Sequence, residues 1–480
     1  MPSDGRGGIG GSVQMAPGGS IGHEGTSNGG TDVHAVGLGG AGGGCAPGAG
    51  GVGVDAVTST DAAGTATTVR LGGTLSDASA EFNRSLGSNG RSCATCHLPD
   101  QAMSLTPAGA VARFNATDGL DPLFRSVDGA VSPLADVSSV ETRRAAYALL
   151  LSKGLIRVGM PVPTGADFDL VAVTDPYNYA SPAELSLFRR PLPSSNLRFL
   201  STVMWDGREG LITGDDASAK LQQALASQAS HAVLGHGQAV SAPSYAEISR
   251  IVDFEMSTFS AQASSLLAGP LDAFSALGGP GPLTQQMFFP GINDPNAMSP
   301  PFNPAVFSTF APWQSTDQQG PDADARLQIS LGETIFNTRV FAMTGVAGLT
   351  TAAEPSVHVT CSVCHNAPGA GSSSTARFFD LGLATAARAS ADFPLYTLQQ
   401  RGTGSQVTVS DPGRALVTGN FSDVATFKVP TLRGLAARPP YFHNGSAATL
   451  ANVVGFYNGR FNIGLTTDEK AALTAFLSAL

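Results

Sequence analysis

The positions of the apolar residues along the chain predict several amphipathic helices and few strands. In residues 245–262 the apolar side chains fall mostly on one side of a helix. These apolar positions are Ile248, Ile251, Val252 and Phe254. A further helical stretch is expected over residues 220–238. Strand-like alternation of apolar and polar residues is weak throughout, so we expect a mainly α-helical fold with long loops.

The second half of the chain predicts three more helices. One is marked by apolar residues that recur every four positions, at Leu327, Leu331 and Ile335. A short helix is expected over residues 449–457. The last helix should begin at Thr466, because Glu469 three residues later completes a capping box. Its expected buried stripe is formed by Leu473, Phe476, Leu477 and Leu480.

Composition divides the chain into four segments. Residues 1–68 are expected to be a disordered tail, because 22 of the first 70 residues are glycine and few large apolar residues occur. Folded domains are expected over residues 69–262 and 324–480. Between them, residues 263–323 hold ten of the 31 prolines and predict an irregular insert or linker. The Met-Phe-Phe run at residues 287–289 is too apolar for a free linker, so we expect it to pack over a domain seam.

The charge balance excludes some classes of partner. The 480 residues carry a formal net charge of −10, which argues against nucleic-acid binding. An acidic surface can steer a basic redox partner or simply keep the protein soluble. No run of 18 or more apolar residues occurs, so no transmembrane helix is expected.

Four of the five cysteines belong to two C-x-x-C-H motifs, and the fifth is Cys45 in the glycine-rich tract. The motifs are Cys93-Cys96-His97 and Cys361-Cys364-His365. Two thiols at this spacing can bond the two vinyl groups of one porphyrin, and the following histidine then ligates the iron. The chain therefore predicts two covalently attached c-type haems. Haem c attachment implies export to the periplasm or beyond, although the sequence shows no signal peptide.

The cysteines have two other possible uses. The two pairs might share one four-cysteine zinc site, or each might be a redox-active dithiol. The pairs lie more than 260 residues apart, and neither alternative explains the histidine that follows each of them. Haem attachment is therefore the preferred interpretation.

Three further segments carry a family resemblance. They are Trp205-Asp206-Gly207-Arg208, the run Phe-Lys-Val-Pro-Thr-Leu-Arg-Gly at 427–434, and Pro-Tyr-Phe-His-Asn-Gly-Ser at 440–446. Together with the haem motifs they resemble the bacterial di-haem cytochrome c peroxidases and the related MauG-type enzymes, over about residues 70–480. The resemblance implies two cytochrome c-like helical domains that face each other, each with one haem. It also implies that peroxide reacts at the N-terminal haem, while the C-terminal haem transfers electrons.

The resemblance also suggests ligands and relay residues. Tyr457 stands where the peroxidases place a methionine ligand and the MauG-type branch a tyrosine, so His365 and Tyr457 are the expected ligands of the second haem. An anionic oxygen ligand lowers the reduction potential of the iron relative to methionine. Trp205 is expected between the haems, as a relay or as a large core residue. His443 and Arg433 resemble residues close to the second haem.

The distal side of the first haem departs from the family pattern. Gln228 matches a family glutamine, but the position ten residues later, where the family has an acid–base glutamate, is Gln238. An amide cannot transfer the proton that peroxide cleavage needs. His231 and His236 lie in the same stretch and are candidates to replace the glutamate, to ligate the iron, or to cap the helix. Met103 and Met160 are weaker ligand candidates.

A calcium ion is a further implied cofactor, with backbone carbonyls near Arg438 and Pro440 and with Asn196 as candidate ligands. The leading interpretation is a peroxidase that uses hydrogen peroxide and takes electrons from a small redox protein or cytochrome. The alternatives are a MauG-like oxidase of a partner protein and a non-enzymatic electron-transfer cytochrome. An open sixth site at the first haem would distinguish the enzymes from the electron carrier.

Overall fold

The structure is a computed structural model that describes residues 53–298, 300–315, 320 and 322–480. Residues 1–52, which include Cys45 and most of the expected tail, lie outside this range. From residue 53 onward the described chain forms one compact unit.

Helices and short strands alternate along the whole described chain. The helices are α1 (Pro107–Thr117), α2 (Val140–Ala146), α3 (Ala148–Lys153), α4 (Ala217–Gly235), α5 (Tyr245–Met256), α6 (Gly281–Gln285), α7 (Ala323–Thr338), α8 (Cys361–Cys364), α9 (Ala415–Thr418), α10 (Leu450–Phe461) and α11 (Thr467–Ser478). The strands are β1 (Val54–Thr60), β2 (Gly64–Leu71), β3 (Ile156–Met160), β4 (Phe168–Thr174), β5 (Leu185–Arg189), β6 (Thr202–Val203), β7 (Gly210–Leu211), β8 (Thr258–Ser265), β9 (Gly269–Pro270), β10 (Phe341–Thr344), β11 (Ser356–Val359), β12 (Phe378–Phe379), β13 (Leu395–Gln400), β14 (Gln406–Val409) and β15 (Phe427–Lys428).

The expectation of a mainly α-helical fold is wrong. Of the described residues, 31% are helical and 18% lie in strands, and several antiparallel sheets are present. The largest sheet has the order β1-β2-β8-β9, and a second has the order β14-β13-β4. Strands β1, β2 and β8 of the first sheet are rich in threonine, serine and alanine, whose small side chains give little contrast between buried and exposed faces. The sheets therefore left a weak pattern in the sequence.

The first sheet also changes two expected boundaries. Helix α5 ends at Met256, and the chain continues as β8 from Thr258, so the helix does not extend to residue 262. Strands β1 and β2 form a hairpin that pairs with β8, which gives residues 54–68 an ordered structure within the expected tail. The β-branched residues of β2 supply the extended conformation that the hairpin needs.

The expected helices of the second half are present. Helices α10 and α11 begin with capping boxes at Thr449 and Thr466, in which each hydroxyl accepts a hydrogen bond from a backbone N–H three residues later. All four residues of the expected stripe of α11 are buried. On α7 the buried side chains include Ile329 and Ile335, whereas Leu331 is 48% exposed. Helix α7 packs closely on α11 at Gly332, where a Cβ atom would lie 2.1 Å from the Ala472 carbonyl oxygen.

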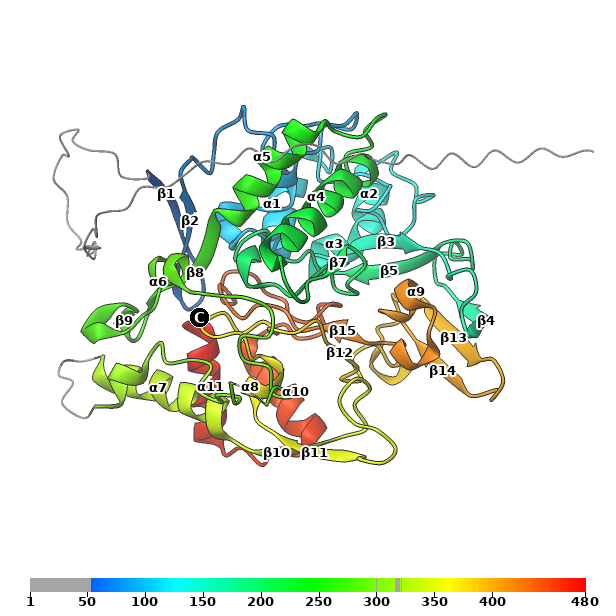
Figure 1. Ribbon diagram of the computed structural model, residues 1–480. Helices are drawn as coiled ribbons and strands as arrows, with labels where there is room; N and C mark the ends of the chain where they lie inside the picture. The colour runs from blue at the N-terminus through cyan, green and yellow to red at the C-terminus, as the bar shows by residue number, and fades with distance from the viewer. Residues whose placement is uncertain (1–52, 299, 316–319, 321) are drawn as a thin grey trace, which may run out of the picture. The chain divides into compact units, whose positions relative to one another are not determined.

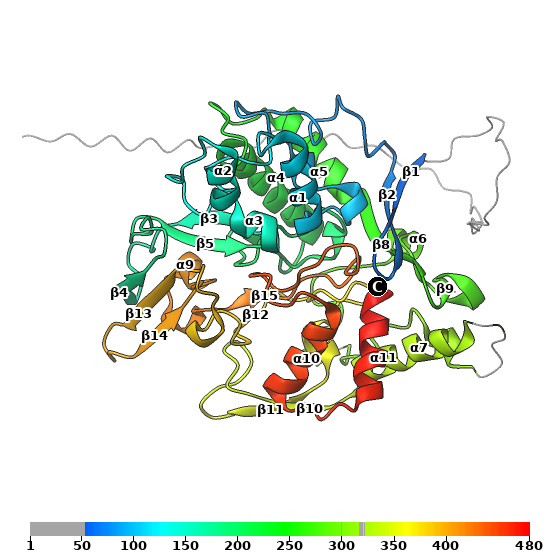
Figure 2. The ribbon, with the colours of Figure 1, turned by 180° about the vertical axis from the view of Figure 1, so that it is seen from behind.

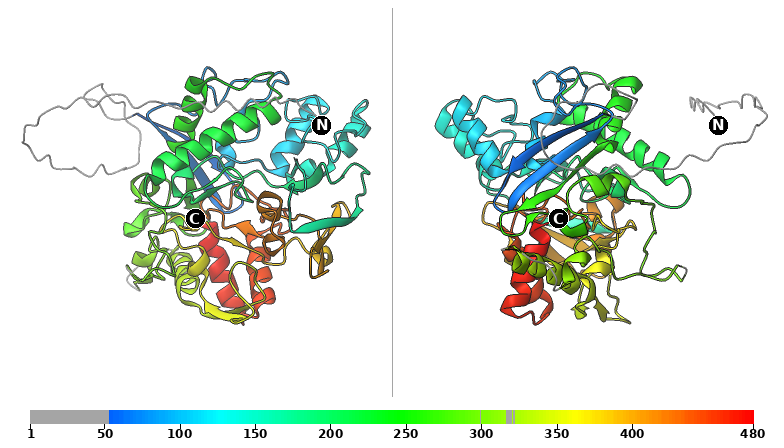
Figure 3. Two further views of the ribbon diagram at one scale, coloured as in Figure 1. Left: turned by 45° about the vertical axis from the view of Figure 1, so that its right-hand side comes forward. Right: turned by 90° about the vertical axis from the view of Figure 1, so that its left-hand side faces the viewer.

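Two groups of helices lie on opposite sides of a central layer of loops and short strands. Helices α1 to α5 lie on one side, and α7, α10 and α11 lie on the other, as both views show (Figures 1 and 2). The pairing of β4 with β13 joins the first half of the chain to the second. Figure 3 shows the long hairpin of β1 and β2 beside β8.

The proline-rich insert packs on the rest of the chain at two places. Met287 and Phe289 are 70% and 50% exposed, but Phe288 packs on a buried cluster that includes Phe199 and Ala367 from the two halves of the chain, so the expected packing holds for Phe288 alone. Later in the insert, Phe307, Phe310 and Trp313 are buried against α7 and α11. Among the described residues, every helix is too short or too polar to cross a bilayer.

Candidate functional site

The first cysteine motif lies in a cavity in the N-terminal half of the described chain. Cys93–Thr95 form a single 3₁₀ turn, and the His97 N–H donates to the Cys93 carbonyl at 3.0 Å. Cys93, Cys96 and His97 therefore lie on one turn, and all three line the cavity. The cavity contains about 1560 Å³ of space free of protein atoms, part of it open to solvent.

The second motif has the same local structure. Cys361 and Cys364 bound α8, and the His365 N–H donates to the Cys361 carbonyl at 3.1 Å. These three residues line a second cavity, which is about 1590 Å³ by the same measure and is lined mostly by aliphatic and aromatic side chains. The two cysteine pairs line different cavities, which rules out the shared four-cysteine zinc site.

Both motif histidines present one ring nitrogen for ligation. His97 Nδ1 bonds the Met103 carbonyl at 3.0 Å, and His365 Nδ1 bonds the Gly371 carbonyl at 2.5 Å. In each case the carbonyl lies six residues after the histidine. A carbonyl acceptor fixes the proton on Nδ1 and leaves Nε2 as the free lone pair, which is the arrangement found in metal-bound histidines.

Burial keeps these groups neutral. It lowers the pKa of His97, and it lowers the pKa of His365 to about 4. Burial likewise raises the pKa of the Cys93 thiol to about 12. A neutral imidazole is the form that ligates iron. The two cysteine turns, the histidine geometry and the apolar walls therefore fit a covalently attached haem in each cavity.

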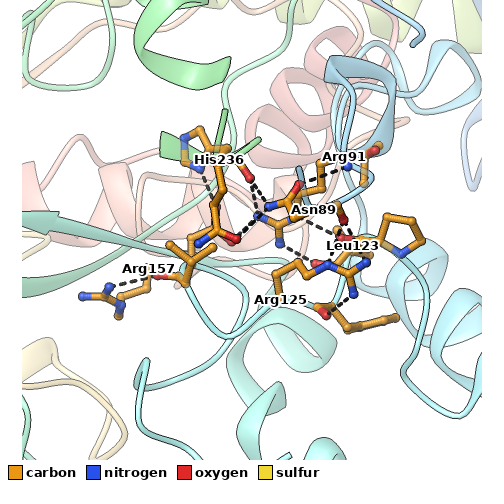
Figure 4. Close-up of polar contacts among 12 residues, drawn as sticks. Asn89, Arg91, Leu123, Arg125, Arg157 and His236 are labelled. Atoms are coloured by element: carbon orange, nitrogen blue, oxygen red, sulfur yellow. Dashed lines mark hydrogen bonds and ion pairs between the residues drawn. The ribbon is translucent and has the colours of Figure 1, made fainter. Parts of the chain in front are cut away.

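A histidine–carboxylate pair stands at the wall of the first cavity. His236, at the C-terminal end of α4, forms a short hydrogen bond through Nδ1 with the buried carboxylate of Asp128. Asp128 also pairs with Arg91, whose guanidinium donates to the carbonyls of Pro122 and Leu123 at 2.9 and 2.6 Å. Figure 4 shows His236 and Arg91 within this network. The ring nitrogen Nε2 of His236 forms no hydrogen bond with the described residues.

The pair is built to hold a negative charge beside the imidazole. Burial alone raises the pKa of Asp128, but the hydrogen bond with His236 and the positive charge of Arg91 outweigh it and hold the pKa below its ordinary value. The Asn89 side chain donates to the His236 carbonyl at 2.7 Å and fixes the backbone of the loop. Asp128 thus orients an imidazole at the cavity wall, which is the geometry of a proton carrier.

Helix α4 turns one face to the first cavity. The lining residues on this face follow helical spacing and are Leu225, Gln228, Ala229, Ala232, Val233 and His236. His231 lies on another face, with a side chain that is 66% exposed and that bonds Glu209 at 3.0 Å. Gln238 is exposed beyond the helix, and its carbonyl accepts a hydrogen bond from Ser88 at 2.7 Å. Of the four sequence candidates in this stretch, only Gln228 and His236 line the cavity.

Tyr457 of α10 lines the second cavity together with His365. Its phenol has no hydrogen-bond partner among the described residues. Burial raises its pKa, and the nearby Cys364 and Cys361 sulfur atoms raise it further. The ring packs in an aromatic group with Phe442, Phe456 and Phe461.

The two cavities share a wall. Seven residues line both of them, namely Arg190, Pro191, Leu192, Trp205, Lys428, Pro430 and Thr431. Trp205 donates from its ring nitrogen to the Arg190 carbonyl at 2.8 Å, and its own carbonyl accepts from the Lys428 N–H at 2.9 Å. The indole is therefore fixed by backbone groups of both halves of the chain.

His443 and Arg433 differ in their relation to the second cavity. His443 lines it, stacks on Phe427 at 3.9 Å between ring centroids, and has a buried Nε2 without a partner in the described chain. Burial lowers the pKa of His443 to about 4. Arg433 is buried behind the wall, where it donates to the Gly369 carbonyl at 2.6 Å, and it lines neither cavity.

The remaining ligand candidates are engaged elsewhere. Met103 and Met160 line neither cavity. The Asn196 amide bonds the backbone of Ser260 through both its nitrogen and its oxygen, at 2.8 and 3.2 Å. The carbonyl of Arg438 and that of the next residue each accept a hydrogen bond from the Arg190 guanidinium at 3.4 Å.

Sequence reasoning missed several cavity residues. Glu255 lines the first cavity and is 4% exposed. It continues the buried stripe of α5, so a glutamate at a position where the spacing demands an apolar residue was the available signal. Lys428 lies inside the 427–434 segment, but no feature of the sequence assigned a role to it. Asp128 lies in a loop far from His236 in sequence, and no local pattern marks it.

Comparison with known proteins points to one group. The chain is 32% identical to the cytochrome-c peroxidase IdrP1 of Denitromonas iodatirespirans over 191 residues, which is 36% of this chain and 44% of that protein. It is 36% identical over 140 residues to IdrP1 of Pseudomonas sp. (strain SCT), covering 25% of this chain and 36% of that protein. It is also 35% identical over 124 residues to the cytochrome c551 peroxidase of Nitrosomonas europaea, covering 25% and 30% of the two chains.

Over these stretches the chain is similar to bacterial cytochrome-c peroxidases, and this similarity confirms the resemblance to that superfamily. The chain spans less than half the length of each of these relatives. No family model matches the chain.

Proposed function

We propose that this chain is a di-haem oxidoreductase that reduces hydrogen peroxide in the first cavity and receives electrons through the second. The observation that carries the proposal is the pair of cavities that share a wall, each with its own cysteine turn and oriented histidine. The homology to cytochrome-c peroxidases supports it. Haem c bound at each turn supplies an iron that takes up peroxide or exchanges single electrons.

Cys93 and Cys96 hold one haem and His97 ligates its iron, while Cys361, Cys364 and His365 do the same in the second cavity. The carbonyls of Met103 and Gly371 keep each imidazole oriented. This support raises the basicity of the ligating nitrogen and fixes the ring against rotation.

His236 moves the proton that peroxide cleavage requires. In the proposed reaction it takes a proton from the oxygen nearer the iron and returns it to the departing oxygen as water leaves. Asp128 holds the ring so that Nδ1 keeps its proton, and it stabilises the imidazolium that forms. Gln228, on the same helical face, is a hydrogen-bond donor for the peroxide. His236 thus replaces the glutamate that the family has at the position of Gln238.

Trp205 carries electrons between the two cavities. Its ring is held by the Arg190 carbonyl and lies 6.2 Å, between ring centroids, from that of His443. An aromatic ring in the shared wall shortens each step of electron transfer compared with passage through aliphatic side chains. His443 packs the wall on the side of the second cavity.

A MauG-type oxidase is the second candidate function. It is favoured by Tyr457, which lines the second cavity and has an unpartnered phenol in the described chain. Ligation of the haem iron by both Tyr457 and His365 would lower its reduction potential, which would suit the oxidation of a partner protein through Trp205. The first candidate takes its electrons from a small redox protein or cytochrome.

The proposal includes export, because haem c is attached outside the bacterial cytoplasm. Calcium stays a prediction outside this proposal, because the carbonyl of Arg438 accepts a hydrogen bond from the guanidinium of Arg190 and the Asn196 amide bonds the backbone of Ser260.

Steady-state reduction of peroxide tests the proposal. The whole chain is produced in a host that attaches haem c and is assayed with a reduced cytochrome c as donor. Replacing Cys93 and Cys96 by serine, or Cys361 and Cys364 by serine, should each halve the haem content and abolish turnover. Turnover that survives the loss of the first pair contradicts the assignment of peroxide reduction to the first cavity. Two six-coordinate haems that are inert to peroxide mean that the chain is an electron carrier.

A further inference from the structure

Two buried cations in the shared wall lack a counter-ion in the described chain. Arg190 and Lys428 are 5% and 6% exposed, and each lines both cavities. Their hydrogen-bond acceptors are backbone carbonyls only. Lys428 Nζ donates to the Thr202 carbonyl at 3.0 Å, and Arg190 donates to the Gly154 carbonyl at 3.0 Å. Neither forms an ion pair with a described carboxylate.

Arg189, which precedes Arg190 in the chain and lines the first cavity, is a buried arginine that has carboxylate partners. Arg189 is equally buried, but it pairs with Asp206 at 2.6 Å and with Asp411 at 2.7 Å. Burial alone lowers the pKa of Arg189, and the two carboxylates more than reverse this effect and raise it. Arg190 has no such partner among the described residues, and the positive charge of Arg438 lowers its pKa further.

Burial has a consequence for both charges. A buried charge without a partner is destabilised unless an opposite charge is supplied. Burial lowers the pKa of Arg190 to about 9 and that of Lys428 to about 7, and for Lys428 the negative charge of Asp206 opposes the shift only in part. Because both groups line both cavities, they indicate that anions bind on both sides of the wall.

Both cavities fit a haem, and the haem itself can supply the anions. A porphyrin of the haem type carries two propionate carboxylates, and carboxylates are natural partners of guanidinium and ammonium groups. The other acidic groups on the wall of the first cavity are already engaged or neutral. Asp128 pairs with Arg91, Glu81 pairs with Arg84 and Arg250, and burial keeps Glu255 protonated near neutral pH.

We propose that Arg190 and Lys428 are a shared cation pair that binds haem carboxylates from both cavities and couples the reduction potentials of the two haems. The inference rests on the proposed function in one respect, namely that both cavities hold haem. Each reduction adds one electron from the donor to one iron, and a positive charge in the shared wall stabilises that electron in either cavity. Arg190 and Lys428 are positioning residues in this scheme, since they act on the irons through the porphyrin.

Spectroelectrochemical titration of the intact protein tests the coupling. In Lys428→Met both reduction potentials should shift downward, because one positive charge close to both haems is lost. Lys428→Arg should keep both potentials near those of the wild type. Lys220→Met is the matched control, since Lys220 is exposed on α4 and lines neither cavity. A shift of one potential alone, or of neither, overturns the proposal.

Two further measurements keep the outcomes distinct. The haem content of every variant is measured first, and fewer than two haems per wild-type chain refutes the proposed function and this inference together. If the protein binds two haems and their reduction potentials do not change in Lys428→Met, only the inference is refuted. If Lys428→Met yields too little folded protein, Arg190→Gln removes the other charge of the pair and should lower both potentials in the same way.

Discussion

The buried carboxyl of Glu255 gives a prediction whose size follows from the structure. The side chain lines the first cavity, it is 4% exposed, and its Oε2 atom has no hydrogen-bond partner in the described chain. Burial raises its pKa from 4.5 to about 8, and a hydrogen bond from Ser194 opposes the rise only in part. The folded protein therefore keeps this carboxyl protonated near neutral pH, whereas the unfolded chain ionises it.

The sign and size of the effect on stability follow by linkage. Between pH 4.5 and pH 8 the unfolded chain binds fewer protons at this site than the folded protein, so the free energy of unfolding falls as the pH rises. A shift from 4.5 to about 8 at 1.36 kcal/mol per unit corresponds to a loss of about 5 kcal/mol. The full contribution is present below pH 4.5 and is gone above about pH 8.

Glu255→Gln removes this dependence, because glutamine has nearly the same shape and does not ionise. The free energy of unfolding of the intact protein is measured by chemical denaturation from pH 4.5 to pH 8.5 for both forms. The variant should match the wild type at low pH and become more stable by several kcal/mol at pH 8.5. Glu354→Gln, at an exposed glutamate outside both cavities, is the control. A difference between Glu255→Gln and wild type that is constant over this range refutes the reasoning.

Three other variants test separate parts of the site. Asp128→Asn should slow the reaction with peroxide about 10- to 100-fold at unchanged haem content, because the imidazole loses its orienting carboxylate; a rate equal to wild type in stopped-flow measurements contradicts the role of His236 as proton carrier. Tyr457→Phe should remove the tyrosinate-type contribution from the ferric absorption and EPR spectra, and an unchanged spectrum excludes Tyr457 as a ligand. Arg189→Met should lower the free energy of unfolding by about 3–5 kcal/mol, because it leaves the buried carboxylate of Asp411 unpaired and leaves Asp206 with Arg208 alone. Equal denaturation midpoints for that variant and wild type would show that the carboxylates find other partners.

The parts of the fold that the sequence predicted well are those with strong local signals. The capping box at Thr466, the short helix that follows Thr449 and the apolar stripe of α11 depend on residues three or four positions apart, and these interactions form inside one helix. The sheets were missed because β1, β2 and β8 are built from small polar residues. Their stability comes from pairing between segments about 190 residues apart, such as Thr68 with Ser260.

The same distinction holds for the site. Each C-x-x-C-H turn is local, so its residues could be named from the sequence. The pairing of His236 with Asp128 joins residues 108 positions apart, and the shared wall joins Arg190 with Lys428. Such contacts depend on how the two halves of the chain meet, and no spacing rule predicts them. His231 and Gln238 were plausible from proximity in sequence, but only the α4 face that carries Gln228 and His236 is directed to the cavity.

The most direct test of the central claim is the response of the ferric protein to hydrogen peroxide. Optical absorption and EPR spectra of the purified intact protein are recorded before and after one equivalent of peroxide, in the resting and half-reduced states. We expect a high-spin component in at least one of these states, and we assign it to the haem at His97. This component should disappear when peroxide is added. Two low-spin haems that do not respond to peroxide in either state would contradict it.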